Sequence, residues 1–432
     1  MIRLVLIGKV VTEMTYHMEI PKDKTIDSSL ALLMEGYRFI PNRRRKFQSD
    51  IFEINLMAQK VVCISGPEAA SVFYDERNFK RQGAAPKRIQ KSIFGQKGVQ
   101  TLDDEAHIQR KSLFMSLFTE ARLEELKTIT EQEWHKIVNK WVSMEEVNLF
   151  AETKKIMCKI ACNWAAVPLQ EKEVAQRAND LWALIDAFGA VGPRHWQGRM
   201  ARKRCDTWTG NLVNDVRAGK LHVEKETPLY EIAWHRDTNG ELLDQKIAAV
   251  EVINIIRPIV AISLYVLFGA VTLYTHPQER DKIINGGKEY MRMFTEEIRR
   301  YYPFTPFLGA RVRREFEWNG YPFKQNQLVL LDVYGMNHDY RIWERPSEFD
   351  PERFKDKQLT KYNFIPQGGG EFIDNHRCAG ELVTIAVMDK SFEFLTKKIS
   401  YHVPKQDLLV RVTRMPPMIQ SGFLMKSVKE RV

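Results

Sequence analysis

The chain has 432 residues, with 65 basic and 55 acidic side chains and a formal net charge of +10. Hydrophobic residues make up 44% of it and charged residues 28%, a balance typical of a soluble globular protein. No Ser/Gly-rich linker, low-complexity run or internal repeat divides the sequence, so we expect one large domain rather than several small ones.

The charge pattern and the cysteines argue against a nucleic-acid-binding protein and against a disulfide-stabilised one. Basic runs at 43–46 and 202–204 are typical of a solvated surface, or attract acidic substrates and anionic lipid. Since no recognisable nucleic-acid motif accompanies them, nucleic acid is not expected as a partner. The five cysteines are an odd number without paired spacing, which excludes a disulfide framework and indicates a reducing, cytoplasmic compartment. Cys158 and Cys162 fit core packing better than metal binding, because no second ligand pair accompanies them.

The predicted elements are mainly helical. In chain order we expect a strand at 52–65, a helix after Gly66-Pro67, helices over most of 105–300, strands at 310–316 and 327–334 with a hairpin turn at Asn319-Gly320, and short strands over 400–427. The fold class is therefore mainly α with small β-sheets.

Two apolar segments, 1–11 and 247–274, are candidates for membrane insertion. Residues 1–11 are apolar for only a few positions and contain Arg3 and Lys9, so they do not form a signal peptide or anchor. In 247–274 only Glu251 and Arg257 are charged, but the uninterrupted apolar part falls short of the ~20 residues that a span requires. We therefore expect a long buried helix and no transmembrane anchor.

Arg257 stands before Pro258 inside this apolar helix. Proline costs a helix interior roughly 3 kcal/mol, and a buried unpaired guanidinium costs several kcal/mol more, so Arg257 needs an anion. Glu251, six residues away, points to a different face and is an awkward partner. The residues leave two possibilities open, a protein carboxylate or the carboxylate of a ligand held by the fork of the arginine.

One cysteine lies in a glycine-rich setting, in the sequence QGGGEFIDNHRCAG over 367–380. Three glycines allow the backbone to approach a flat ligand closely. Apolar residues recur at helical spacing after Cys378 and put it at a helix N-terminus, where the dipole favours a thiolate. A thiolate pushes electron density onto haem iron for O–O cleavage. The pattern predicts a haem-thiolate loop; the alternative is a buried, inert cysteine before a core helix.

Two further motifs accompany Cys378. The sequence MFTEEIRRYYP at 293–303 holds a Glu-x-x-Arg pair in two registers, Glu296/Arg299 and Glu297/Arg300, and its spacing favours Glu297 and Arg300. Arg353 follows in the sequence FDPERF. A helical Glu-x-x-Arg joined by such an arginine resembles the buried ion-pair triad of the cytochrome P450 superfamily.

Within that superfamily, the Arg-Pro pair, the glycine stretch and the sequence NHRCAG resemble the bacterial fatty-acid peroxygenases, over about 21–428 of the chain. The resemblance implies the cytochrome P450 fold, with haem b between a long distal helix and the proximal Cys378 loop. It implies a single catalytic domain over 21–432, preceded by a dispensable extension over 1–20. Hydrogen peroxide would be the co-substrate, no reductase would be required, and a long-chain fatty acid would be hydroxylated at its α and β carbons.

One departure from ordinary monooxygenases supports this resemblance. Those members carry an acid followed by Thr or Ser over the haem, and 254–262 contains no such pair. In the peroxygenases the substrate carboxylate, bound to the arginine that matches Arg257, replaces the missing acid as general acid–base.

The resemblance also assigns roles to individual residues. Gln100 aligns with the distal determinant of product, where hydroxylating members carry Gln and a decarboxylating member carries His, so we predict hydroxy acids as major products and terminal alkenes as minor ones. The remaining assignments are Arg257, Gln100 and Pro258 as catalytic residues, Cys378 as iron ligand, Arg81, His107, Lys111 and His376 for the haem propionates, and Phe94, Phe307 and Leu308, with Arg257, for the substrate.

Three other functions stay open at this stage. A reductase-dependent monooxygenase would share the haem motifs, and an alkene-forming fatty-acid decarboxylase would differ only in product. A haem-binding sensor would explain Cys378 but gives no reason to bury Arg257 in an apolar helix.

Overall fold

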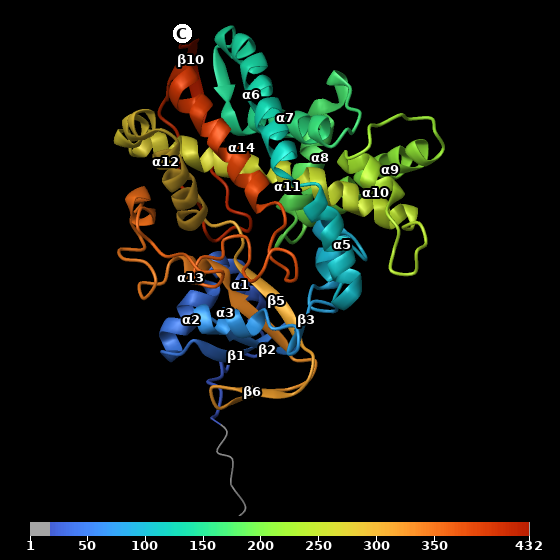
Figure 1. The fold of residues 1–432 in the computed structure, drawn as a ribbon. Coiled ribbons are helices and arrows are strands. Elements are labelled where there is room, and N and C mark those ends of the chain that lie inside the picture. Colours follow the sequence, from blue (N-terminus) through green and yellow to red (C-terminus); the bar gives the residue numbers. More distant parts are fainter. Residues whose placement is uncertain (1–17, 432) are drawn as a thin grey trace, which may run out of the picture.

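The computed structural model describes residues 18–431, which form a large helical body beside a smaller β-rich lobe (Figure 1). The predicted extension over 1–20 lies almost wholly outside the described residues; of its last residues, Ile20 is buried against the sheet of the lobe. The helices are α1 (Ser29–Glu35), α2 (Phe39–Phe47), α3 (Pro67–Phe73), α4 (Lys87–Ile89), α5 (Asp104–Ser116), α6 (Glu120–Val142), α7 (Leu149–Trp164), α8 (Val174–Asp186), α9 (Pro193–Arg217), α10 (Pro228–Trp234), α11 (Gln245–Thr275), α12 (Gln278–Tyr301), α13 (Val333–Asn337) and α14 (Glu381–Glu393). The fold is mainly α, as predicted.

The β-rich lobe contains a five-stranded sheet in the order β1-β2-β8-β5-β3. Its strands are β1 (Ile51–Leu56), β2 (Gln59–Ile64), β8 (Leu328–Asp332), β5 (Phe307–Val312) and β3 (Phe79–Lys80). The prediction of a single strand over 52–65 was wrong: β1 and β2 form an antiparallel hairpin. Its turn residues, Met57 and Ala58, have positive φ angles of 52° and 57° although neither is a usual residue for that conformation.

Two smaller sheets complete the fold. A three-stranded sheet joins β4 (Glu146–Asn148), β10 (Leu424–Glu430) and β9 (Ile399–His402), and a hairpin joins β6 (Phe316–Trp318) to β7 (Tyr321–Phe323). The hairpin turns at Asn319 and Gly320, with φ angles of 50° and 77°, so the predicted turn is confirmed.

Helix α11 runs through the helical body and packs against α7, α9 and α14 (Figure 1). Asp244 caps its N-terminus by accepting the N–H groups of Lys246 (2.9 Å) and Ile247 (3.3 Å). By length and mean hydropathy α11 is apolar enough to cross a membrane, but 94% of its most apolar window is buried inside the protein. It is therefore the long core helix that the sequence predicts, with Pro258 in its interior.

A buried ion cluster fastens the segment before the cysteine loop to α12. Glu297 accepts both Nε and Nη2 of Arg300 at 2.6 Å, and its Oε1 also accepts Nε of Arg353 at 3.2 Å. The neighbouring register is a buried ion pair as well, between Glu296 and Arg299. Only the pair Glu297/Arg300 is joined by Arg353, so the structure brings together the three residues that the sequence selected.

Arg299 links the same helix directly to the cysteine loop and to α14. Its guanidinium pairs with Glu381, the first residue of α14, at 2.5 Å. Its Nε donates to the side-chain oxygen of Gln367 at 3.1 Å. Arg299 and Glu381 are almost fully buried and Gln367 is partly buried, and these contacts hold the loop to α12 at one end and to α14 at the other.

Candidate functional site

The cysteine loop before α14 has a backbone that requires glycine. Gly368 and Gly370 have φ angles of 93° and 82°, which residues with a side chain rarely adopt. The N–H of Cys378 donates to the carbonyl of Gln367 at 3.1 Å, and the side-chain nitrogen of Gln367 lies 3.8 Å from Cys378 Sγ. The loop therefore presents the sulfur with an N–H group directed at it, just before the N-cap of α14, Gly380.

The protein surroundings of Cys378 favour the neutral thiol. Burial raises the pKa of the Cys378 thiol, and the carboxylate of Glu381 raises it further, while Lys111 and Arg299 only partly oppose them. The N–H of Gly380 at the N-terminal end of α14 lowers the pKa of Cys378, the direction expected at a helix N-terminus, but burial outweighs it. A coordinating metal cation deprotonates a thiol outright, so a metal ion bound at Cys378 would favour the thiolate.

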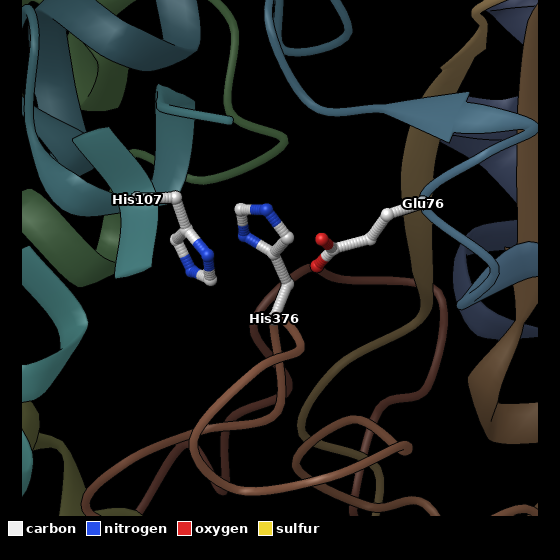
Figure 2. Close-up of side chains that lie close together, drawn as sticks. All are labelled: Glu76, His107 and His376. Atoms are coloured by element: carbon white, nitrogen blue, oxygen red, sulfur yellow. The ribbon is translucent and has the colours of Figure 1, made fainter. Parts of the chain in front are cut away.

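Figure 2 shows Glu76, His107 and His376 close together beside this loop. The two imidazole rings stack with centroids 3.8 Å apart, and possible ligand atoms of all three residues lie within 4.8 Å of one another. Burial lowers the pKa of His107 to about 4 and that of His376 to about 3, so both rings are neutral near pH 7. His107 Nδ1 is buried and has no hydrogen-bond partner.

Asp103 anchors the same cluster. Burial raises the pKa of this carboxyl, but hydrogen bonds from His376 and from the N–H groups of Arg81 and Gln82 outweigh burial and bring the pKa to about 2. The two backbone bonds measure 2.7 and 2.8 Å. The backbone of Arg81 is therefore fixed next to His376.

Two buried cations complete the cluster. The guanidinium of Arg81 lies 4.3 Å from the centre of the Phe73 ring, and its pKa is lowered by burial. Lys111 Nζ donates to the backbone carbonyls of Asn375 (3.0 Å) and Arg377, and burial lowers its pKa to about 8. The structure thus brings together all four residues that the sequence assigned to the propionates. They offer two cations and two neutral imidazole rings in surroundings that are partly shielded from water. Such hydrogen-bond donors suit buried carboxylates.

On α11, the guanidinium of Arg257 is buried without an anion. Its Nη2 donates to Asn254 Oδ1 at 3.3 Å, and its Nε has no partner. Burial, and to a smaller extent the charge of Arg202, lower the pKa of Arg257 to about 10, so the group stays protonated at neutral pH. Among residues 18–431, none forms a salt bridge with it.

Glu251, the nearest acidic residue in the helix, is occupied elsewhere. It is fully buried and accepts Arg110 Nη1 at 2.7 Å and the N–H of Val99 at 3.0 Å. Glu251 is therefore paired with Arg110 and does not form an ion pair with Arg257. Arg110 was not identified from the sequence. Glu251, an acid in an apolar helix, indicates that a cation is needed, but Arg110 lies 141 residues away and no local pattern points to it.

Asn254 connects these groups to Gln100, and it also escaped the sequence analysis. Its amide nitrogen donates to Glu251 Oε2 at 2.8 Å and to Gln100 Oε1 at 3.3 Å, while its oxygen accepts Arg257. Gln100 is thereby brought to the same side of α11 as Arg257. A single amide orients both residues.

The residues assigned to the substrate chain do not all share one surface. Phe307 and Leu308 are successive residues of β5 and pack against two different hydrophobic clusters of the β-rich lobe. Phe94 ends a π-helical turn, Gln90–Phe94, that packs against α9. Phe304, which the sequence analysis passed over, stacks on Tyr265 of α11 at 4.7 Å between ring centres. Phe304 therefore contacts α11, as does Tyr302, whose ring stacks on Phe268 at 4.4 Å between ring centres.

Comparisons with known proteins extend over almost the whole chain. A sequence profile described as Cytochrome P450 matches residues 288–422. A curated relative, the bifunctional dihydrocamalexate synthase/camalexin synthase of Arabidopsis thaliana, is 24% identical over 84% of this chain and 82% of its own length. Among solved structures, cytochrome P450EX alpha (CYP152N1) with myristic acid is 44% identical, with a TM-score of 0.93 over 96% of this chain and 100% of its own. The chain belongs to the cytochrome P450 family.

Two more structures narrow the position of this cytochrome P450 within the family. A variant of cytochrome P450SP alpha (CYP152B1) is 41% identical, with a TM-score of 0.92 over 94% of this chain and 100% of that one. A variant of cytochrome P450 OleT in complex with arachidonic acid is 34% identical, with a TM-score of 0.93 over 96% and 99% of the two chains. This protein is thus similar throughout to the CYP152 group.

A cytochrome P450 holds haem through a Cys thiolate, and the residues of this one fit that group. All five cysteines lie within residues 18–431, and Cys378 is the one that is not buried in the core. The glycine-rich loop presents Cys378 before α14, Nδ1 of His107 has no hydrogen-bond partner, and the cations of the partly buried Arg81 and the buried Lys111 suit the two propionates. A metal cation bound at the sulfur would also account for a thiolate that the protein surroundings alone disfavour.

Proposed function

We propose that this cytochrome P450 is a hydrogen-peroxide-dependent fatty-acid peroxygenase that hydroxylates long-chain fatty acids at the α and β carbons. The observation that carries the proposal is the buried guanidinium of Arg257, which has no anion among residues 18–431. A fatty-acid carboxylate supplies one. The complexes of cytochrome P450EX alpha with myristic acid and of cytochrome P450 OleT with arachidonic acid support this substrate class.

In this mechanism the chain's own residues position the carboxylate and exclude other acids. Arg257 binds it, and Asn254 fixes the guanidinium from one side. Pro258 has no N–H to give to the carbonyl one turn earlier, which loosens the helix beside the site. Haem bound to Cys378 supplies the iron that activates the peroxide, and the carboxylate held by Arg257 acts as general acid–base for the peroxide proton.

The same arrangement makes a reductase unnecessary. Residues 254–262 contain no acid–alcohol pair to deliver protons to bound oxygen, and Glu251 is bound to Arg110. Hydrogen peroxide brings both oxygen and its oxidising equivalents, so neither NADPH nor a partner protein is needed. We further propose that the protein acts in the cytoplasm without a transmembrane anchor, which its free cysteines and buried α11 support.

Gln100 directs the choice of product in this proposal. Its amide is bonded to Asn254 and offers only neutral hydrogen bonds, so it does not deliver or accept a proton near the oxidised carbons. Hydroxy acids are therefore the major products and terminal alkenes the minor ones.

The test is product analysis by gas chromatography–mass spectrometry. Purified ferric protein is given tetradecanoic or hexadecanoic acid and hydrogen peroxide, without NADPH or reductase, and α- and β-hydroxy acids are expected. A terminal alkene one carbon shorter as main product would keep the role of Arg257 but refute that of Gln100. No turnover unless NADPH and a reductase are added would favour the monooxygenase alternative.

A further inference from the structure

Helix α9 carries a second buried guanidinium next to the Arg257 site, that of Arg202. We propose that Arg202 is a second residue that binds the substrate carboxylate, so that this anion lies between two arginines. The inference rests on the proposed function, because it concerns the carboxylate that Arg257 is proposed to hold.

Arg202 is incompletely partnered although it is only 4% exposed. Its Nε donates to Asp206 at 2.8 Å, and its Nη1 reaches the carbonyl of Ile93 at 3.4 Å. Its Nη2 is buried and has no hydrogen-bond partner. Asp206 is 44% exposed at its side chain, so much of its charge is screened by water. The guanidinium thus keeps one N–H group without a partner, and its charge is only weakly compensated by Asp206.

The open N–H lies against α11 and the loop that leads to Gln100. A Cβ added to Gly95 would lie 2.5 Å from Arg202 Nη2 and 2.4 Å from Val250 Cγ1, so these two side chains meet at this glycine. A Cβ on Gly98 would lie 3.0 Å from Asn254 Nδ2 and 3.1 Å from the same Val250 atom. Both glycines therefore pack directly against this side of α11, and Arg202 Nη2 lies beside Val250 in the same contact.

Along that side of α11, Val250, Asn254 and Arg257 follow one another at helical spacing. Arg202 Nη2 lies beside Val250, and Asn254, one turn further along this face, accepts Nη2 of Arg257. Both guanidinium groups are buried and have an unpartnered nitrogen, Nη2 in Arg202 and Nε in Arg257. Two unpartnered cationic donors thus adjoin the same side of α11, and no salt bridge to a described carboxylate satisfies Arg257.

Electrostatics favours a shared anion at this place. Arg202 is close enough to lower the pKa of Arg257, so the two charges repel each other while the site lacks an anion. A carboxylate has two oxygens and about four lone-pair sites, enough for contacts to two guanidinium groups. Arg202 therefore acts as a positioning residue for a carboxylic acid and adds nothing for a ligand with a neutral head group.

A purely structural role predicts a different result. The bond to Ile93 could only fasten the turn before Gly95 to α9, in which case loss of Arg202 would disturb every ligand alike. Comparing an acid with the alcohol of the same chain length separates the two roles.

The experiment is a spectral titration of the haem-loaded protein with tetradecanoic acid and with 1-tetradecanol. Arg202→Gln removes the charge at similar volume, and Lys203→Gln removes one from the exposed neighbour on the same helix. We expect Arg202→Gln to raise the Kd of the acid about tenfold, since a hydrogen bond to a charged group is lost, and to leave the alcohol within about twofold. Lys203→Gln is expected to leave both ligands within about twofold.

A second variant keeps the test decisive where Arg202→Gln does not yield folded protein. Asp206→Asn leaves Arg202 in place but removes the exposed carboxylate that competes for it, and it is expected to tighten acid binding about threefold. Unchanged or weaker acid binding in Asp206→Asn overturns the inference, as does equal weakening of acid and alcohol in Arg202→Gln.

Failure of the inference is distinguishable from failure of the proposed function. If Arg257→Gln abolishes acid binding while Arg202→Gln leaves it unchanged, Arg202 has no part in binding and the peroxygenase proposal stands. If neither variant affects the acid more than the alcohol, both proposals are wrong.

Discussion

Replacing Arg257 by methionine should separate its cost to folding from its value in binding. Burial lowers the pKa of Arg257 from its ordinary value of 12.5 to about 10, which corresponds to about 3 kcal/mol by which the buried site disfavours the charged form. Because the folded-state pKa is lowered, this cost is present at every pH below about 10 and thus throughout the neutral range. Methionine has a similar length and no charge. We therefore expect Arg257→Met to be as stable as the wild type or more stable by up to about 3 kcal/mol when no substrate is present.

The fatty acid should reverse that order. Removing one partner of a buried charge pair costs roughly 2–5 kcal/mol, so the Kd for tetradecanoic acid should rise by about 30-fold or more. At an acid concentration of about 100 times the wild-type Kd, the wild type gains about 2.7 kcal/mol, whereas a variant with a 30-fold higher Kd gains about 0.9 kcal/mol. The free energy of unfolding is measured in urea by circular dichroism on haem-loaded protein, with 1-tetradecanol as the neutral ligand. A variant that is less stable without substrate and binds the acid normally would show that Arg257 is a structural residue.

Four further substitutions test other parts of the site. Gln100→His should shift the products toward the terminal alkene, and an unchanged product ratio by gas chromatography–mass spectrometry would remove Gln100 from the mechanism. Glu297→Gln leaves two buried arginines without their carboxylate and should lower the free energy of unfolding by about 3–5 kcal/mol in urea; a loss under about 1 kcal/mol would contradict this. Lys111→Met should speed the transfer of haem to an apo-haem acceptor protein about tenfold, because a buried cation is lost beside the propionates, whereas an unchanged rate would refute its role. Gly95→Ala forces a Cβ into Val250 at a φ of 80° and should cost about 1–3 kcal/mol, while Gly192→Ala, at a φ of 65° with open space, is the control for backbone strain alone.

The sequence predicts those features that depend on local pattern. The apolar run of α11 and the unusual Arg257-Pro258 pair indicate a buried helix with an unpaired cation, because each residue's environment follows from its neighbours along the helix. The Asn319-Gly320 turn follows from the positive φ angles that these residue types tolerate. The register Glu297/Arg300 was selected from spacing to neighbouring residues, and the structure joins it to Arg353.

The features that escaped prediction depend on contacts between distant segments or on atypical turn residues. The partner of Glu251 is Arg110, on a helix whose register relative to α11 is determined only by packing. In the sequence Asn254 is one polar residue in an apolar stretch, and nothing near it in the chain indicates that Gln100 is its partner. The hairpin turn at Met57 and Ala58 carries no turn signal, so the sequence read as one continuous strand. The pKa of Cys378 is raised because burial and the carboxylate of Glu381 outweigh the N–H of Gly380 and the nearby cations, a balance that depends on the folded surroundings.

Helix α5 connects the two sides of the site. His107 and Lys111 lie one turn apart on α5 at the proposed propionate edge, and Arg110 on the same helix holds Glu251, which through Asn254 orients Arg257. A rotation or shift of α5 would therefore move the proposed propionate residues and the residues that orient Arg257 together. A substitution that displaces α5 is expected to change both cofactor binding and binding of the substrate carboxylate.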